Sequence, residues 1–365
     1  MASDAHSGPD APSSLATHPR STPQPAAIRH VIIGGYTSEM DGGARGVSTV
    51  RLEAAGADQQ ADELAAVELR SPSYLIRHPS QPWLFATSEA VPGFVTSYRI
   101  RDDATLEPLG TVGVTADEPC HLAVTPDQTL LVVANYGSGS VSSFAIHADG
   151  TLSEQLDLLQ FEGSGPDPDR QTGPHAHQVV FDGDELLVSD LGTDRIHRLA
   201  VGADGRLSLV APPVQLPSGA GPRHLVLMGD FLVVACELSA HLWLGCRTTT
   251  GWDAVTYVSS STVEIDEPIY PSALVAHGSR VYVANRGAGT VAAFDLDADN
   301  ELLVFAGEFP CGGPWPRDLE LSAGRLWVAN QTNDVVSVFS TAAVPSGTPV
   351  LEFASPSPAC LVLLP

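Results

Sequence analysis

Residues 119–136 read PCHLAVTPDQTLLVVANY: a proline, a short apolar run, a polar turn, a second apolar run and a small polar ending. The pattern returns along the chain, opened each time by a proline: Pro72, Pro119, Pro174, Pro222, Pro271, Pro316 and Pro358. Their separations are 47, 55, 48, 49, 45 and 42 residues. A period of roughly 40–50 residues built from short β-rich runs is typical of a β-propeller with about four strands per blade.

The two ends of the chain are complementary. The last copy of the pattern stops at Pro365 after one strand, whereas strand-like residues 30–36 and 46–52 precede the first proline. We expect the two ends to share a blade, which closes the ring and leaves no open edge. The sequence therefore predicts an all-β, seven-bladed β-propeller over residues 29–365, preceded by a disordered tail, residues 1–28. Two β-sandwiches are the alternative fold, but they give no reason for evenly spaced prolines.

Charge and cysteine content narrow the function. The chain carries 18 basic residues, all arginine, against 43 acidic ones, for a net charge of −25. This balance argues against binding to nucleic acid or to an anionic membrane, and the absence of lysine excludes Schiff-base chemistry. Five cysteines without a C-x-x-C spacing predict buried free thiols in a reducing compartment, so we expect a cytoplasmic protein.

Polar residues recur at two positions of the repeat, which a propeller places around its central channel. The residues directly after the seven prolines are Ser73, Cys120, His175, Arg223, Ser272, Arg317 and Ala359. Strand alternation puts His177 on the same face as His175. The endings of the second runs are Ser88-Glu89, Asn135-Tyr136, Asp190-Leu191, Glu237-Leu238, Asn285-Arg286 and Asn330-Gln331. Together they predict a channel that binds an anion and carries both acidic and basic groups.

Other polar residues have structural explanations. Asp190 precedes the turn Leu-Gly-Thr-Asp and is expected to fix that turn through hydrogen bonds. The asparagines at the strand endings, Asn135, Asn285 and Asn330, recur too regularly to be catalytic. His121 and His224 lie one residue beyond the channel position, so we expect them to face the packing between blades as core histidines.

These landmarks resemble the seven-bladed propeller lactonase family, which includes propeller-type 6-phosphogluconolactonases and 3-carboxy-cis,cis-muconate lactonizing enzymes. The resemblance is carried by PHAHQVV, SDLGTD, GPRHLV with ACELS, VANRGAG and WPRDLEL, in family order across residues 30–365. It implies a lactone site served by His175 or His177, Arg223, Glu237 and Arg286. Arg317, Gln331 and Tyr136 are expected to bind substrate, with Arg317 on a distal phosphate or carboxylate.

Lactone hydrolysis needs a base for water, donors for the oxyanion and recognition of the substrate's own charge. Glu237 or a histidine is expected as the base, and the expected reaction is hydrolysis of 6-phosphogluconolactone to 6-phosphogluconate in carbohydrate metabolism, the pentose phosphate pathway. The alternatives are a muconate cycloisomerase, a non-catalytic binding propeller, and a metal-dependent gluconolactonase using Glu89, Asn135, Asp190 and Asn285. We expect no cofactor or metal, because three channel arginines repel a cation, and a monomer or weak homodimer.

Overall fold

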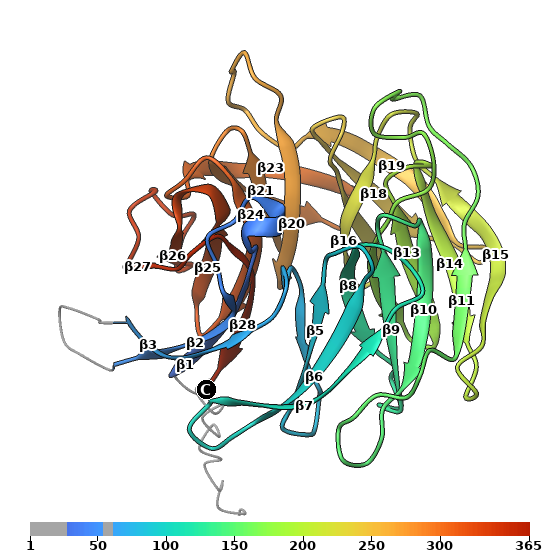
Figure 1. The fold of residues 1–365 in the computed structure, drawn as a ribbon. Helices are drawn as coiled ribbons and strands as arrows, with labels where there is room; N and C mark the ends of the chain where they lie inside the picture. Colours follow the sequence, from blue (N-terminus) through green and yellow to red (C-terminus); the bar gives the residue numbers. More distant parts are fainter. Residues whose placement is uncertain (1–27, 54–60) are drawn as a thin grey trace, which may run out of the picture.

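The computed structural model describes residues 28–53 and 61–365. The predicted tail, apart from residue 28, lies outside these ranges. The described chain forms seven four-stranded antiparallel sheets arranged as a ring (Figure 1). The prediction of an all-β, seven-bladed propeller is confirmed.

Four blades come from the first two-thirds of the chain and are built alike, from the channel outward. The first blade contains β4 (Leu75–Arg77), β5 (Trp83–Ser88), β6 (Phe94–Ile100) and β7 (Leu106–Gly113). The second contains β8 (Pro119–Val124), β9 (Leu130–Asn135), β10 (Ser140–Ala145) and β11 (Asp157–Gln160). The third contains β12 (Ala176–Asp182), β13 (Glu185–Asp190), β14 (Arg195–Val201) and β15 (Leu207–Gln215). The fourth contains β16 (Pro222–Met228), β17 (Phe231–Cys236), β18 (His241–Arg247) and β19 (Trp252–Ser259).

The remaining blades complete the ring. The fifth contains β20 (Tyr270–His277), β21 (Arg280–Arg286), β22 (Thr290–Asp297) and β23 (Leu302–Pro310). The sixth contains β24 (Pro316–Ser322), β25 (Arg325–Asn330), β26 (Val335–Ser340) and β27 (Leu351–Ala354). The seventh combines β28 (Pro358–Leu364) with β1 (His30–Gly35), β2 (Gly46–Leu52) and β3 (Ala61–Glu68). Helical structure in the described ranges is limited to the 3-10 turns η1 (Ser38–Met40) and η2 (Gln331–Asn333), and no described helix has the length and apolarity to cross a membrane.

The seventh blade closes the ring as the sequence predicts. Its innermost strand, β28, pairs antiparallel with β1 in a register that matches His30 with Leu364 and Ile33 with Leu361. Strands from the two ends of the chain thus form one sheet, which closes the ring.

The apolar runs pack between neighbouring blades. Phe85 of the first blade and Leu131 and Phe144 of the second are fully buried in one cluster, and six similar clusters fill the other seams. Each such side chain contributes about 1.5–3 kcal/mol when buried. The blades are therefore held by side-chain packing across the seams, and the channel is free to carry polar groups.

The two faces of the ring differ in their connections. The tight turns between the first and second strands of the blades lie on one face, and the connections that lead from one blade to the next lie on the other. Two of the latter are long, residues 161–175 before β12 and residues 260–269 before β20. Figure 1 shows the connection into β20 rising above the ring. The inner strands begin on this face, which is therefore where the polar positions of the repeat gather.

Candidate active site

A β-bulge at the start of the inner strands determines which residues enter the channel. The strand register slips around Cys120, His177, Arg223 and Arg317, each of which has no partner on the second strand of its blade. A bulge sets two residues against one and interrupts the alternation of side chains. Two consecutive residues can therefore face the channel, as Arg223 and His224 do in one small enclosed cavity of about 20 Å³.

The bulge corrects the predicted position of His175. His177, not His175, occupies the channel position shared with Arg223 and Arg317, because β12 starts two residues after its proline. His175 instead lies at the mouth of the channel, where its ring stacks on Tyr136 with centroids 4.5 Å apart. Its Nδ1 lies 2.9 Å from the carbonyl oxygen of Tyr136. Since a carbonyl only accepts, Nδ1 carries the proton and Nε2 of the neutral ring is an acceptor.

The prediction that His121 and His224 are packed between blades is wrong. His121 belongs to the second blade and His224 to the fourth, yet their ring centroids are 5.8 Å apart. The ring centroid of His224 also lies 5.6 Å from that of His177, in the third blade. The three rings thus meet across the channel. Because all are buried beside Arg223, the pKa of His121 falls to about 3, and those of His177 and His224 fall well below their ordinary value. The floor of the channel is therefore a cluster of neutral histidines.

Glu237 forms the centre of the channel mouth. It directly follows Cys236, the last residue of β17. Cys236 and Glu237 therefore form the two-residue ending of this strand, and Glu237 holds the second position, as Arg286 does after Asn285 in the fifth blade. One carboxylate oxygen, Oε1, lies 2.8 Å from Nη2 of Arg170. The other, Oε2, lies 3.1 Å from Nε of Arg223 and 2.6 Å from Nη2 of Arg286. One buried carboxylate is thus shared by three guanidinium groups.

This sharing sets the charge of the site. Burial alone would raise the pKa of Glu237, but Arg286, Arg223 and Arg170 outweigh burial and hold it at about 2. Burial and the nearby Arg286 and Arg317 lower the pKa of Arg223 to about 9. Nη1 of Arg223 is buried and has no hydrogen-bond partner among the described residues, whereas Nε of Arg223 and Nη2 of Arg286 make only their ion pairs with Oε2 of Glu237. The mouth therefore holds excess positive charge and one buried guanidinium nitrogen without a partner among the described residues, a combination that favours an anionic ligand.

Aromatic rings orient two of the arginines. The guanidinium of Arg286 lies 5.4 Å from the ring centroid of Trp315 and 5.9 Å from that of Tyr270. Arg317 lies 4.6 Å above the ring of Tyr36 and 4.0 Å from Oε2 of Glu89. Such contacts fix a planar cation without consuming all of its donors.

Other predicted residues take lesser positions. Gln331 starts η2, and its backbone N–H donates to the carbonyl of Trp315 at 3.0 Å, so it lies beside Arg286. Asp190 accepts hydrogen bonds from the backbone of His175 and Gly192 and from the hydroxyl of Thr193, which confirms its role in the turn. Asn135, Asn285 and Asn330 donate to groups that include Ser142, the Ser260 carbonyl and the Cys311 carbonyl.

The same hydrogen bonds bear on the metal-dependent alternative. Asp190, Asn135 and Asn285 make hydrogen bonds at the strand endings of three different blades, but the two asparagines use their amide nitrogens, and their buried Oδ1 atoms have no partner among the described residues. Among the residues that the structure describes, no three His, Cys, Asp or Glu side chains are grouped closely enough to hold a metal ion.

Four residues of the site escaped the sequence analysis. Tyr36 holds the same blade position as Tyr136, so the repeat register contained its signal once the shared seventh blade is counted. Tyr270 and Trp315 flank the repeat prolines and could have been noted there. Arg170 lies in the connection before β12, outside the repeat, and no periodic pattern marks it.

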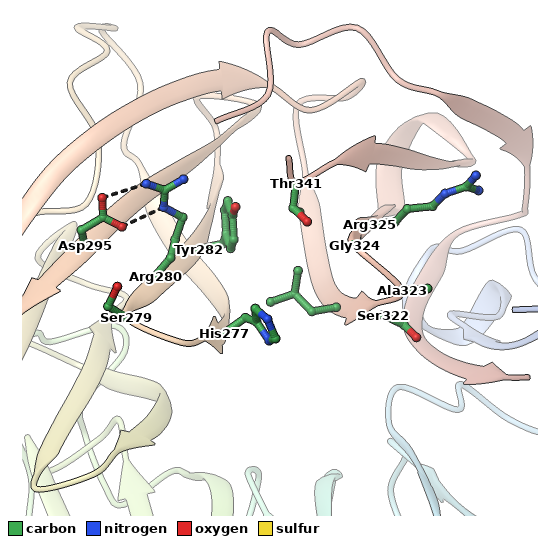
Figure 2. Close-up of a pocket in the computed structure, with 11 residues that line it drawn as sticks. His277, Ser279, Arg280, Tyr282, Asp295, Ser322, Ala323, Gly324, Arg325 and Thr341 are labelled. Carbon is green, nitrogen blue, oxygen red and sulfur yellow. Dashed lines mark hydrogen bonds and ion pairs between the residues drawn. The ribbon is translucent and has the colours of Figure 1, made fainter. Parts of the chain in front are cut away.

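A large cavity lies elsewhere. It measures about 1110 Å³ and is formed on the opposite face by the turns that follow β20 and β24 (Figure 2). Arg280 and Asp295 form a two-pronged ion pair there, with distances of 2.8 and 2.7 Å. The predicted site residues line none of it.

Comparisons with known proteins bear on the family of the fold. A family described as "Lactonase, 7-bladed beta-propeller" matches residues 30–362. The chain is 28% identical to the 6-phosphogluconolactonase of Bacillus subtilis, with 84% of this chain and 89% of that protein aligned. It is 41% identical to the "Probable 6-phosphogluconolactonase" of Arthroderma benhamiae, with 67% of each aligned. The solved periplasmic gluconolactonase of Pseudomonas aeruginosa superimposes with a TM-score of 0.85 at 26% identity, covering 93% of this chain and 99% of that one.

Proposed function

Because the chain belongs to the lactonase family of seven-bladed β-propellers, we propose that it hydrolyses a sugar-acid lactone, with 6-phosphogluconolactone as its substrate. One observation carries the proposal: three guanidinium groups share the single buried carboxylate of Glu237, and Nη1 of Arg223 has no partner among the described residues. His175, whose Nδ1 donates to the Tyr136 carbonyl, offers Nε2 as an acceptor at the same mouth. The names of the relatives in Bacillus and Arthroderma support the phosphorylated substrate.

The proposed mechanism assigns the base to His175. Its Nδ1–H donates to the Tyr136 carbonyl, and its Nε2 takes a proton from water as the water oxygen bonds to the lactone carbonyl carbon. Arg223 and Arg286 stabilise the resulting oxyanion. When the tetrahedral intermediate collapses, the bond to the ring oxygen breaks and the imidazolium returns its proton to that oxygen. The product is the open-chain acid.

Glu237 takes a different part in this scheme. With a pKa of about 2 it is a weak base near neutral pH. Its two oxygens instead fix the directions of Arg170, Arg223 and Arg286. We therefore propose that Glu237 orients the arginines, whereas the sequence analysis left it as a candidate base.

The proposal is tested by proton release in weakly buffered solution above the spontaneous rate. The purified protein is given 6-phosphogluconolactone, gluconolactone and, in a separate assay, 3-carboxy-cis,cis-muconate, whose cyclisation is followed by loss of ultraviolet absorbance. We expect the phosphorylated lactone to be hydrolysed fastest. If none of the three reactions is accelerated, a binding propeller is favoured. Turnover of the muconate alone would favour a cycloisomerase, and loss of activity in the presence of a chelator would favour a metal-dependent enzyme.

We also propose a cytoplasmic location, supported by the five cysteines, all of which are free in the structure. The similar Pseudomonas protein is described as periplasmic, so the compartment needs its own measurement. Fractionation of the source cells with an antibody to the protein should place it with cytoplasmic markers. Recovery in a periplasmic fraction would overturn this proposal without affecting the proposed activity.

A further inference from the structure

Arg170 differs from the other arginines around Glu237. It lies in the connection between β11 and β12 rather than on a strand. Its side chain is 37% exposed, whereas those of Arg223 and Arg286 are 3% and 7% exposed. It therefore stands at the outer edge of the site, where a substrate arrives.

The connection that carries Arg170 is firmly held. The neighbouring Gln171 is fully buried, and its Nε2 donates to the Leu191 carbonyl at 2.8 Å and to Oδ1 of Asp194 at 2.7 Å. Asp194 also accepts from the backbone N–H groups of Gly219 and Gly221, which lead into the strand of Arg223. The carboxylate of Asp194 thus links the segment that carries Arg170 to the segment that carries Arg223. The backbone at Arg170 is therefore held in place before a ligand binds.

Arg170 uses only part of its donor capacity. Its Nη2 makes both side-chain contacts, with Oε1 of Glu237 at 2.8 Å and with the Tyr136 hydroxyl at 3.2 Å. Nε and Nη1 make no hydrogen bond or ion pair with the described residues. Arg247 is a useful contrast because its side chain is also 37% exposed, yet both of its terminal nitrogens bind Asp182. Arg170 is anchored at one nitrogen and keeps two for a ligand.

From this arrangement we propose that Arg170 binds a phosphomonoester on the sugar, remote from the lactone carbonyl, and so sets the preference for phosphorylated over unphosphorylated lactones. The inference rests on the proposed lactonase function. Three arginines against one glutamate leave two positive charges in excess, which suits a phosphate dianion. A partly exposed arginine also lets the phosphate keep some of its water, so its desolvation costs less than at Arg223.

Three charged residues bear on this assignment. Asp169 is exposed on the same connection and opposes an anion, whereas Oδ1 of Asp167 accepts the backbone N–H groups of Asp169 and Arg170. Arg317, which the sequence analysis assigned to a distal phosphate, lies over Tyr36 and beside Glu89, with its side chain 17% exposed. Arg317 is therefore the rival position that the experiment must separate from Arg170.

The test compares kcat/KM for 6-phosphogluconolactone and gluconolactone in Arg170→Gln, Arg317→Gln and the control Arg247→Gln. We expect Arg170→Gln to lower kcat/KM for the phosphorylated lactone on the order of 10- to 100-fold, mainly through KM. Its kcat/KM for gluconolactone should fall by a clearly smaller factor, because only the contacts of Arg170 with Glu237 and the Tyr136 hydroxyl are lost there, so the preference for the phosphorylated lactone shrinks. Arg247→Gln should change neither. Equal losses on both lactones in Arg170→Gln, or a collapsed preference only in Arg317→Gln, would overturn the inference.

A binding measurement keeps the inference testable apart from turnover. Calorimetry with 6-phosphogluconate and gluconate gives the phosphate preference of wild type and Arg170→Gln directly. An Arg170-dependent preference in a protein that hydrolyses neither lactone would refute the proposed function and uphold the role of Arg170. No preference for the phosphorylated acid, or one unchanged in Arg170→Gln, would refute the role of Arg170 even in an active lactonase.

Discussion

At the mouth of the channel three arginines share the carboxylate of Glu237, whereas on the opposite face Arg280 has the carboxylate of Asp295 to itself (Figure 2). The second arrangement satisfies both partners and leaves little for a ligand. The first is largely buried and sets three positive charges against one negative charge. The cavity of about 1110 Å³ lies at the satisfied pair, so the proposed site follows uncompensated charge and not cavity volume.

The largest effect should follow when the shared carboxylate is neutralised. Glu237→Gln leaves three guanidinium groups facing one another, so we expect kcat to fall roughly 10²–10⁴-fold and KM to rise. Removal of one partner from a buried ionic cluster should also lower the free energy of unfolding by about 3 kcal/mol. Steady-state kinetics and urea unfolding measure both.

The split between kcat and KM separates the two roles open to Glu237. A general base would lose kcat with substrate affinity little changed, and His175→Ala would then keep most of the activity. If Glu237 orients the arginines, KM must change as well, and His175→Ala should itself lower kcat roughly 10²–10⁴-fold. His277→Ala, on the opposite face, is the control.

A second test compares Arg286 and Arg280 for the need of a planar guanidinium group. Arg286 lies near two aromatic rings and contacts Glu237, so an ammonium cannot reproduce its planar donors. We expect Arg286→Lys to lower kcat/KM by about 10²-fold, nearly as much as Arg286→Ala. Arg280→Lys should leave it unchanged. Near-full activity in Arg286→Lys would mean that charge alone is needed there.

The ring, its closure and the clustering of the candidate site residues could be predicted from the sequence because each repeats with the blade. The spacing of the prolines located the inner strands, and Arg223, Glu237 and Arg286 follow from that register. The errors at His121 and His224 share one cause, the bulge, which interrupts the alternation that strand periodicity assumes. His175 was misplaced because β12 begins two residues after its proline. Arg170 was missed because a connection between blades has no period, and only the folded chain brings it to Glu237.

The channel histidines should make the protein sensitive to acid, a third and smaller effect. The folded pKa of His121 is about 3 against an ordinary 6.5, and those of His177 and His224 are also lowered. Below pH 6.5 the unfolded chain therefore binds protons that the folded chain does not, and stability falls as pH falls. For each such histidine the loss is about 1.4 kcal/mol per pH unit between about pH 6 and its folded pKa.

Urea unfolding of His121→Gln between pH 7 and pH 4.5 tests this slope. The variant should lose less stability on acidification than wild type, by about 1–2 kcal/mol at pH 5. His277→Gln, exposed on the opposite face, should follow the wild-type curve. Parallel curves for wild type and His121→Gln would mean that His121 is not kept neutral by the fold.

The smallest effect on stability and activity is expected from a substitution on the opposite face. It is the strictest test of the contrast between the Arg280–Asp295 pair and the arginines around Glu237. Asp295→Ala removes the partner of Arg280, but the two side chains are 41% and 28% exposed, so water can replace the lost contact. Exposed ion pairs contribute about 0–1 kcal/mol, and we expect the free energy of unfolding to fall by no more than that. kcat/KM for 6-phosphogluconolactone should stay within about 2-fold of wild type, because no site residue lines the large cavity. A marked loss of activity in Asp295→Ala, with stability and the Glu237 cluster intact, would show that the large cavity takes part in turnover. Unsatisfied buried charge would then have been the wrong guide to the site, and the cavity of Figure 2 would have to be considered as a second binding position for the lactone.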